Sequence, residues 1–236
     1  MNVAHLQKLS MSISRNPREL EQLRTTTRMN MYVELKQLSE KHWTGKYTKA
    51  ECGRISMEVE RRLCGDPVAP GAAPLSAEIQ QGVTQALAIV RAEAPEVAIA
   101  ASFMRWSRAA GLLMKLKNQE AEAELKAALE YDPNNAFALC SMAYLAGFQG
   151  DSKEALVLSQ RALALNPNLP EAYLEMGNAY ETLGDHNQAM EAWEKARKIS
   201  PDMVKLDDLS ETAAKVVAGR DRPRYEVLTD EPEDVK

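Results

Sequence analysis

Residues 170–203 read PEAYLEMGNAYETLGDHNQAMEAWEKARKISPDM, and this stretch decides the fold. It places Tyr173 and Tyr180 on one apolar stripe and Trp193 on a second stripe farther along the chain. Apolar residues at three- and four-residue spacing predict amphipathic helices. Gly184, which stands between the two stripes, is typical of a helix end. The stretch therefore predicts two helices joined by a short turn, that is, a helical hairpin.

The same features recur at a fixed step along the chain. Three sets of residues keep a spacing of 34: Pro133, Pro167 and Pro201; Ala121, Ala155 and Ala189; and Ala128, Ala162 and Ala196. Small side chains let the two helices of a hairpin approach closely, because a larger side chain would push the helices apart. Proline is tolerated directly after a helix, where its missing N–H does no harm. A fixed period of this length predicts a stack of helical hairpins.

The unit 170–203 closely resembles the tetratricopeptide repeat, whose pattern is W-x-x-L-G-x-x-Y…A-x-x-x-F-x-x-A…P. Its aromatic residues occupy the aromatic positions of that pattern. The units 136–169 and 102–135 match less fully, and the unit 102–135 matches mainly in its second helix. The resemblance implies an all-α fold, a right-handed α-solenoid of three repeat hairpins with flanking capping helices, preceded by a small helical hairpin domain.

The register of the first repeat can be read in two ways. A strict 34-residue spacing places Arg105 and Arg108 in apolar positions of its first helix. A shift of one residue places Trp106 and Leu113 there instead, and it leaves one residue missing from the turn. Because burying two charged side chains is costly, we expect the shifted register.

Prolines and capping residues divide the chain into four parts. Thr48 and Glu51 have the spacing of a capping box, and Ser76 is a typical N-cap. The predicted parts are a basic helical hairpin region (1–66), a Pro/Ala linker (67–75), a repeat domain (76–219) and a disordered acidic tail (220–236). Within the repeat domain we expect a capping helix (76–94), the repeats (102–135, 136–169 and 170–203) and a C-terminal capping helix (204–219).

Charge and composition narrow the class of partner and the compartment. The net charge is −5, and residues 1–66 hold 12 Lys and Arg against 8 Asp and Glu. A nucleic-acid surface would need a denser basic cluster, so no nucleic-acid partner is expected. The three cysteines are an odd count, which favours reduced thiols. We find neither a transmembrane run nor an apolar signal segment, and we expect a cytoplasmic protein.

The resemblance implies a binding groove on the concave side, lined by the first helix of each repeat. The candidate partner-binding residues are Phe103, Trp106, Phe137, Tyr144, Phe148, Glu171, Glu175 and Asn178. This groove would be aromatic toward its N-terminal side and acidic toward its C-terminal side. The expected partner is a protein or peptide with apolar and basic residues. Some family members bind a terminal carboxylate through Lys and Arg at the positions of Glu171 and Glu175, so no such clamp is expected here.

We expect no catalysis, no cofactor and no metal site, because the sequence holds no phosphate-binding glycine loop, no H-E-x-x-H and no paired C-x-x-C. The leading function is a non-catalytic adaptor or scaffold that binds a peptide segment or partner subunit in the groove. The alternative is a dedicated chaperone or assembly factor for a secretion system or multisubunit complex. Two further roles stay open for residues 1–66, namely homo-oligomerisation through the hairpin and autoinhibition by occupation of the groove.

Overall fold

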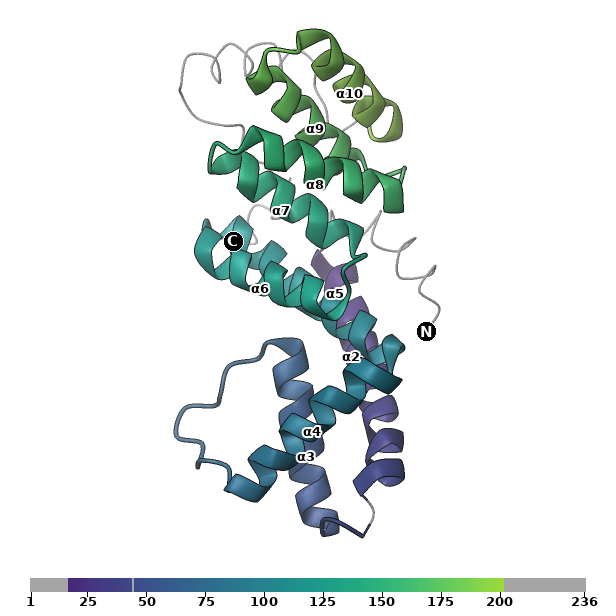
Figure 1. Ribbon diagram of the computed structural model, residues 1–236, viewed down its shortest axis with the longest axis vertical. Helices are drawn as coiled ribbons and strands as arrows, with labels where there is room; N and C mark the ends of the chain where they lie inside the picture. Colours follow the sequence, from purple (N-terminus) through teal and green to yellow (C-terminus); the bar gives the residue numbers. More distant parts are fainter. Residues whose placement is uncertain (1–16, 44, 202–236) are drawn as a thin grey trace, which may run out of the picture.

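The structure is a computed structural model that describes residues 17–43 and 45–201, and the elements in those ranges are helices (Figure 1). The N-terminal helices are α2 (Pro17–Trp43), α3 (Lys49–Cys64) and α4 (Ala77–Glu93). They are followed by α5 (Pro95–Met114), α6 (Asn118–Tyr131), α7 (Ala136–Phe148), α8 (Ser152–Leu165), α9 (Pro170–Leu183) and α10 (His186–Ile199). The predicted capping helix 204–219 and acidic tail 220–236 lie outside the described residues.

Helices α5 to α10 form a stack of three hairpins, which confirms the all-α repeat solenoid (Figure 1). The second helices of the hairpins begin at Asn118, Ser152 and His186, at the predicted 34-residue step. Six alanines at the predicted seams are each at most 1% exposed: Ala121, Ala128, Ala155, Ala162, Ala189 and Ala196. Their burial is expected, since small residues at these positions allow the two helices of a hairpin to pack closely.

The first repeat follows the strict register, so the expected one-residue shift was wrong. The turn residues Leu116, Gly150 and Gly184 lie 34 positions apart and all have positive φ, at 58°, 90° and 86°. The N–H of Lys117 donates to the carbonyl oxygen of Leu112 at 3.0 Å, and the other two turns repeat this bond at the same step. No residue is missing from the first turn.

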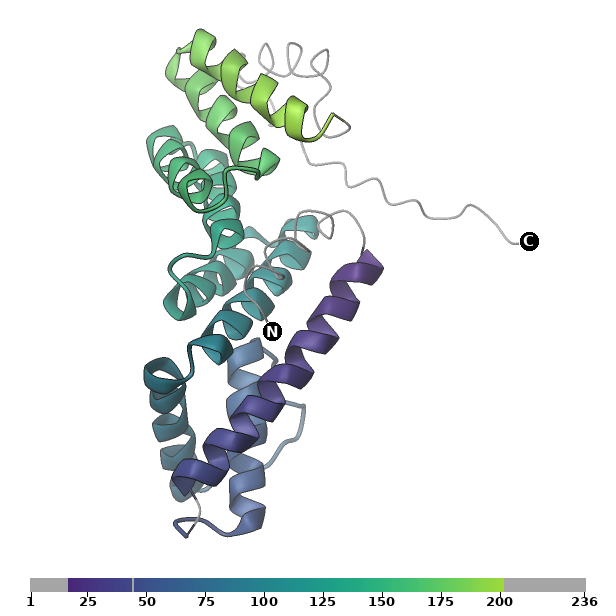
Figure 2. The same ribbon diagram turned by 90° about the vertical axis from the view of Figure 1, so that its right-hand side faces the viewer.

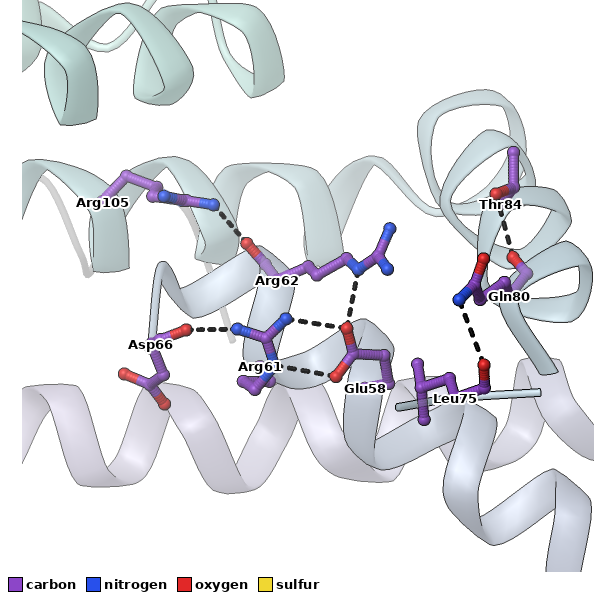
Figure 3. Close-up of polar contacts among 8 residues, drawn as sticks. All are labelled: Glu58, Arg61, Arg62, Asp66, Leu75, Gln80, Thr84 and Arg105. Atoms are coloured by element: carbon purple, nitrogen blue, oxygen red, sulfur yellow. Dashed lines mark hydrogen bonds and ion pairs between the residues drawn. The ribbon is translucent and has the colours of Figure 1, made fainter. Parts of the chain in front are cut away.

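Partners found elsewhere in the fold explain why the strict register is tolerated. Arg105 lies 2.7 Å from a carboxylate oxygen of Glu124 on α6, and Arg108 lies 3.1 Å from the other oxygen. Arg105 also donates to the backbone carbonyl oxygen of Arg62 at the end of α3 (Figure 3). It donates to the carbonyl oxygen of Leu63 as well. A partly buried charge is acceptable when ion pairs and hydrogen bonds satisfy it. Our sequence argument assumed that both arginines lacked such partners.

The helix starts predicted in the N-terminal part are present. The Thr48 hydroxyl accepts from the Glu51 N–H at 3.3 Å, and the Glu51 carboxylate accepts from the Thr48 N–H at 2.7 Å. The Ser76 hydroxyl accepts from the Ile79 N–H at 3.3 Å. Such caps satisfy backbone donors that a helix start would otherwise leave unpaired.

The end of α3 is held by a network of charged side chains (Figure 3). The Glu58 carboxylate accepts from Arg61 Nε at 2.7 Å and from Arg62 Nε at 2.8 Å. Arg61 also donates to the carbonyl oxygen of Asp66 at 2.6 Å. Gly65 ends the helix with a φ of 74°, and a Cβ at this position would lie 2.6 Å from Arg105. Close approach of α5 to the end of α3 thus depends on glycine.

The hairpin α2–α3 does not form the separate small domain that we expected. Its side chains Leu23, Met31 and Ile55 share one core with Val83 of α4 and Ala101 of α5. The reason is that the apolar stripe of α2, a helix of 27 residues, is longer than the 16-residue α3 can cover. The Pro/Ala segment joins α3 to α4, which contact each other, so it connects neighbours within one core.

Helix α2 runs along the side of α5 that faces away from α6, as both views show (Figures 1 and 2). The chain's own α2 therefore covers one side of α5, the helix on which we expected the groove to begin.

Candidate functional site

Two of the aromatic residues expected in the groove lie in the buried contact between α5 and α7. Phe103 is 6% exposed and Trp106 is 5% exposed. Their ring centroids lie 5.7 Å apart, and the centroid of Phe137 lies 5.2 Å from that of Trp106. The Trp106 indole N–H donates to the Ser141 hydroxyl at 3.2 Å. These side chains hold the first and second repeats together.

Helix α2 also packs against α5, the first helix of the first repeat. Its side chains Leu23, Met31 and Leu35 belong to the same core cluster as Phe103 and Trp106. Most positions of α5 that were expected to line a groove are therefore covered by other parts of the chain. Both α5 residues of the expected set, Phe103 and Trp106, are buried, so any accessible members of that set lie on α7 or α9.

Two aromatic residues of the expected set, one exposed and one half-buried, lie in the C-terminal half of α7. Phe148 is 54% exposed, and Tyr144 is half-buried. Their rings stack with centroids 6.5 Å apart and an interplanar angle of 29°. Met114, one repeat step before Phe148, is 58% exposed. Aromatic rings exposed in this way are common anchors at protein interfaces.

Two acidic side chains lie on α9, the first helix of the third repeat. Glu171 is half-buried, and Glu175 is only 3% exposed. Burial raises the pKa of the Cys140 thiol well above its usual value, and the negative charges of Glu171 and Glu175 raise it further. The field of both carboxylates thus reaches α7, one helical turn from Tyr144. We call Tyr144, Phe148, Glu171 and Glu175 the α7–α9 face.

Asn178, the last of the expected site residues, supports the interior of the third repeat. Its Oδ1 accepts from the indole N–H of Trp193 at 3.3 Å. Gly177 lies against the same indole, because a Cβ at this position would overlap the ring. The indole of Trp193 is 4% exposed, so Asn178 satisfies a buried donor.

The structure therefore brings together only part of the expected set. Tyr144 and Phe148 stack on α7, and Glu171 and Glu175 lie on the contacting helix α9. By contrast, Phe103 and Trp106 are core residues, Phe137 packs against Trp106, and Asn178 binds Trp193. Sequence reasoning missed that α2 covers the first repeat. One signal was present: Leu23, Thr27, Met31 and Leu35 form a stripe at four-residue spacing that is too long for one short partner helix.

The described part of the chain contains no group of three His, Cys, Asp or Glu side chains that could hold a metal ion. Burial raises the pKa of the Cys64 thiol to about 12, so this thiol is protonated at neutral pH. None of the described helices combines the length and the apolar character needed to cross a membrane.

Three family models match the chain, and all three describe tetratricopeptide repeats. Two models named tetratricopeptide repeat match residues 170–203 and 124–157, and one named TPR repeat matches residues 149–184. No curated protein matches the sequence. Among 43 matching chains of solved structures is one titled "Crystal structure of MamA". It is 15% identical, with 69% of this chain and 85% of that chain covered and a TM-score of 0.37, which is too remote to inform the function.

Proposed function

We propose that this chain, a tetratricopeptide repeat protein over residues 124–203, is a non-catalytic adaptor that binds a segment of another protein on the α7–α9 face. Repeats of this family are protein-interaction modules, which supports the general role. The observation that supports the specific site is the stack of the exposed Phe148 on the half-buried Tyr144, on a helix that contacts the acidic helix α9.

The chemistry of this face favours a partner with apolar and basic side chains. An apolar side chain packed on Phe148 would remove a half-exposed ring from water, and aromatic anchors of this kind contribute about 2 kcal/mol or more each. The half-buried Glu171 would favour Lys or Arg on the partner, whereas the buried Glu175 would act only through its charge. Such charges would orient the segment more than they would tighten its binding. A terminal carboxylate would meet like charge on α9, so we propose no carboxylate clamp.

A quantitative pull-down from cytoplasmic extract tests the site. We compare immobilised wild type with the variant Tyr144→Ala/Phe148→Ala and with the control Val157→Ala, which removes a 49% exposed apolar side chain from α8. The proposal predicts that the double variant loses its partner by roughly 10-fold or more, because about 1.4 kcal/mol corresponds to a factor of ten. If the double variant and the control capture the same proteins in equal amounts, the site is refuted.

The captured set also separates the adaptor from the chaperone or assembly factor. An adaptor retains several folded partners. A dedicated chaperone retains one partner that is insoluble when the chain is absent, and expression of that partner alone and together with the chain distinguishes the two roles.

Homo-oligomerisation through the hairpin is a second proposal, supported by exposed apolar side chains on both of its helices. Met29, Tyr32 and Val33 of α2 are 67%, 49% and 51% exposed, and Met57 of α3 is 63% exposed. Light scattering on the full chain and on Tyr32→Asp tests this contact. A dimer in wild type and a monomer in the variant support it, whereas equal masses exclude it.

A further inference from the structure

The direction of α2 determines where residues 1–16 start. Its C-terminal end is held at the end of α4, where Lys41 Nζ lies 2.8 Å from a carboxylate oxygen of Glu93. Its other end, at Pro17, is the end nearer to α7 in both views (Figures 1 and 2). The chain that precedes Pro17 therefore starts from the end of α2 that is nearer to α7.

The composition of residues 1–16 complements that face. The segment holds Lys8 and Arg15 and contains no Asp or Glu. Its apolar residues are Met1, Val3, Ala4, Leu6, Leu9, Met11 and Ile13. Apolar anchors combined with basic side chains are the chemistry that Tyr144, Phe148 and the glutamates of α9 favour.

The other segment outside the described residues is a poorer candidate for the same face. Residues 202–236 hold 10 Asp and Glu against 6 Lys and Arg. An acidic segment would be repelled by Glu171 and Glu175, so charge favours the N-terminal segment as the occupant.

We propose that residues 1–16 bind the α7–α9 face of their own chain and compete there with the partner segment. This inference rests on the proposed function of that face. An extended segment of this length spans up to about 50 Å. The contacts run from α2 to α5, from α5 to α7 and from α7 to α9, and each neighbouring pair lies about 8–10 Å apart, so the reach is sufficient. A short tether gives an effective concentration of about millimolar, so even a weak intramolecular contact would reduce partner binding measurably.

The test uses the full chain and a fluorescent synthetic peptide of residues 1–16. Three proteins are compared: wild type, Leu6→Ser/Ile13→Ser, and the matched control Asn2→Ser/Gln7→Ser, which exchanges polar side chains only. We call Leu6→Ser/Ile13→Ser the apolar-loss variant. We expect it to bind the peptide about 10-fold more tightly than wild type and the control do, because its own segment no longer competes. Amide hydrogen exchange in α7 and α9 should also be faster in that variant.

Equal peptide affinity and equal exchange in all three proteins would overturn the inference. Peptide binding that survives Phe148→Ala in the apolar-loss variant would also overturn it, because the segment would then bind elsewhere. If protection of α7 and α9 in wild type rises with protein concentration, the segment binds a second copy, and the same-chain inference fails. None of these results decides the proposed function, because the pull-down test of that function depends only on Tyr144 and Phe148.

Discussion

Gly177 shows how the absence of one methyl group sets the packing of the third repeat. Alanine is favoured over glycine in helices by about 1 kcal/mol, but a Cβ at Gly177 would overlap the indole of Trp193. Overpacking of this kind costs about 1–3 kcal/mol. We predict that Gly177→Ala lowers the free energy of unfolding in urea titrations. The control Gly111→Ala, whose Cβ meets no atom within 4 Å, should leave it unchanged or raise it. Equal losses in both variants would contradict this packing.

Glu58 makes the stability of α3 depend on pH. Hydrogen bonds from Arg61, and then from Arg62, lower the pKa of Glu58 from 4.5 to about 2. A lowered folded-state pKa stabilises the fold above the unfolded value, and this contribution is lost as pH falls from about 4.5 to about 2. We predict that the stability difference between wild type and Glu58→Gln narrows by about 1–3 kcal/mol over this window. Urea titrations at several pH values measure it, and a constant difference would refute the assignment.

At the scale of the element, the turn between α5 and α6 differs from its two counterparts. Leu116 has a φ of 58°, whereas glycine occupies the same position at Gly150 and Gly184. A left-handed conformation costs a residue with a Cβ about 1–2 kcal/mol. Leu116 is 57% exposed, so its replacement loses little packing. Leu116→Gly should therefore raise the melting temperature, and Gly150→Ala should lower it. Shifts of the same sign in the two variants would exclude a conformational origin.

The helices also show which features the sequence could predict and which it could not. The capping pair Thr48–Glu51 and the cap Ser76 are local, and their residues alone indicated where helices begin. The 34-residue step predicted the hairpins, because the repeated residues can be read directly from the sequence. The partners of Arg105 come from α3 and α6, far away in sequence, so no local pattern could show that its charge is satisfied. The burial of Trp106 also depends on distant residues, because Phe137 and Ser141 of α7 contact it.

At the scale of the whole molecule, Arg105 links the N-terminal helices to the first repeat. Its guanidinium contacts Glu124 and two carbonyl oxygens at the end of α3. Arg105→Met should lower the free energy of unfolding by about 1–3 kcal/mol, since it leaves polar groups unpaired. Hydrogen exchange should accelerate in α3, α5 and α6 but not in α9 or α10. The control Lys126→Met removes an exposed charge from α6 and should change neither quantity. Equal acceleration throughout the chain would contradict a local link.

The central claim is that the α7–α9 face binds segments with apolar and basic residues. Selection from a displayed library of random peptides tests this claim most directly. Wild type and Tyr144→Ala/Phe148→Ala are used as baits in parallel. The claim predicts that wild type enriches peptides in which aliphatic residues neighbour Lys or Arg, and that the double variant loses this enrichment. Enrichment of acidic peptides, or of the same peptides by both baits, would contradict it.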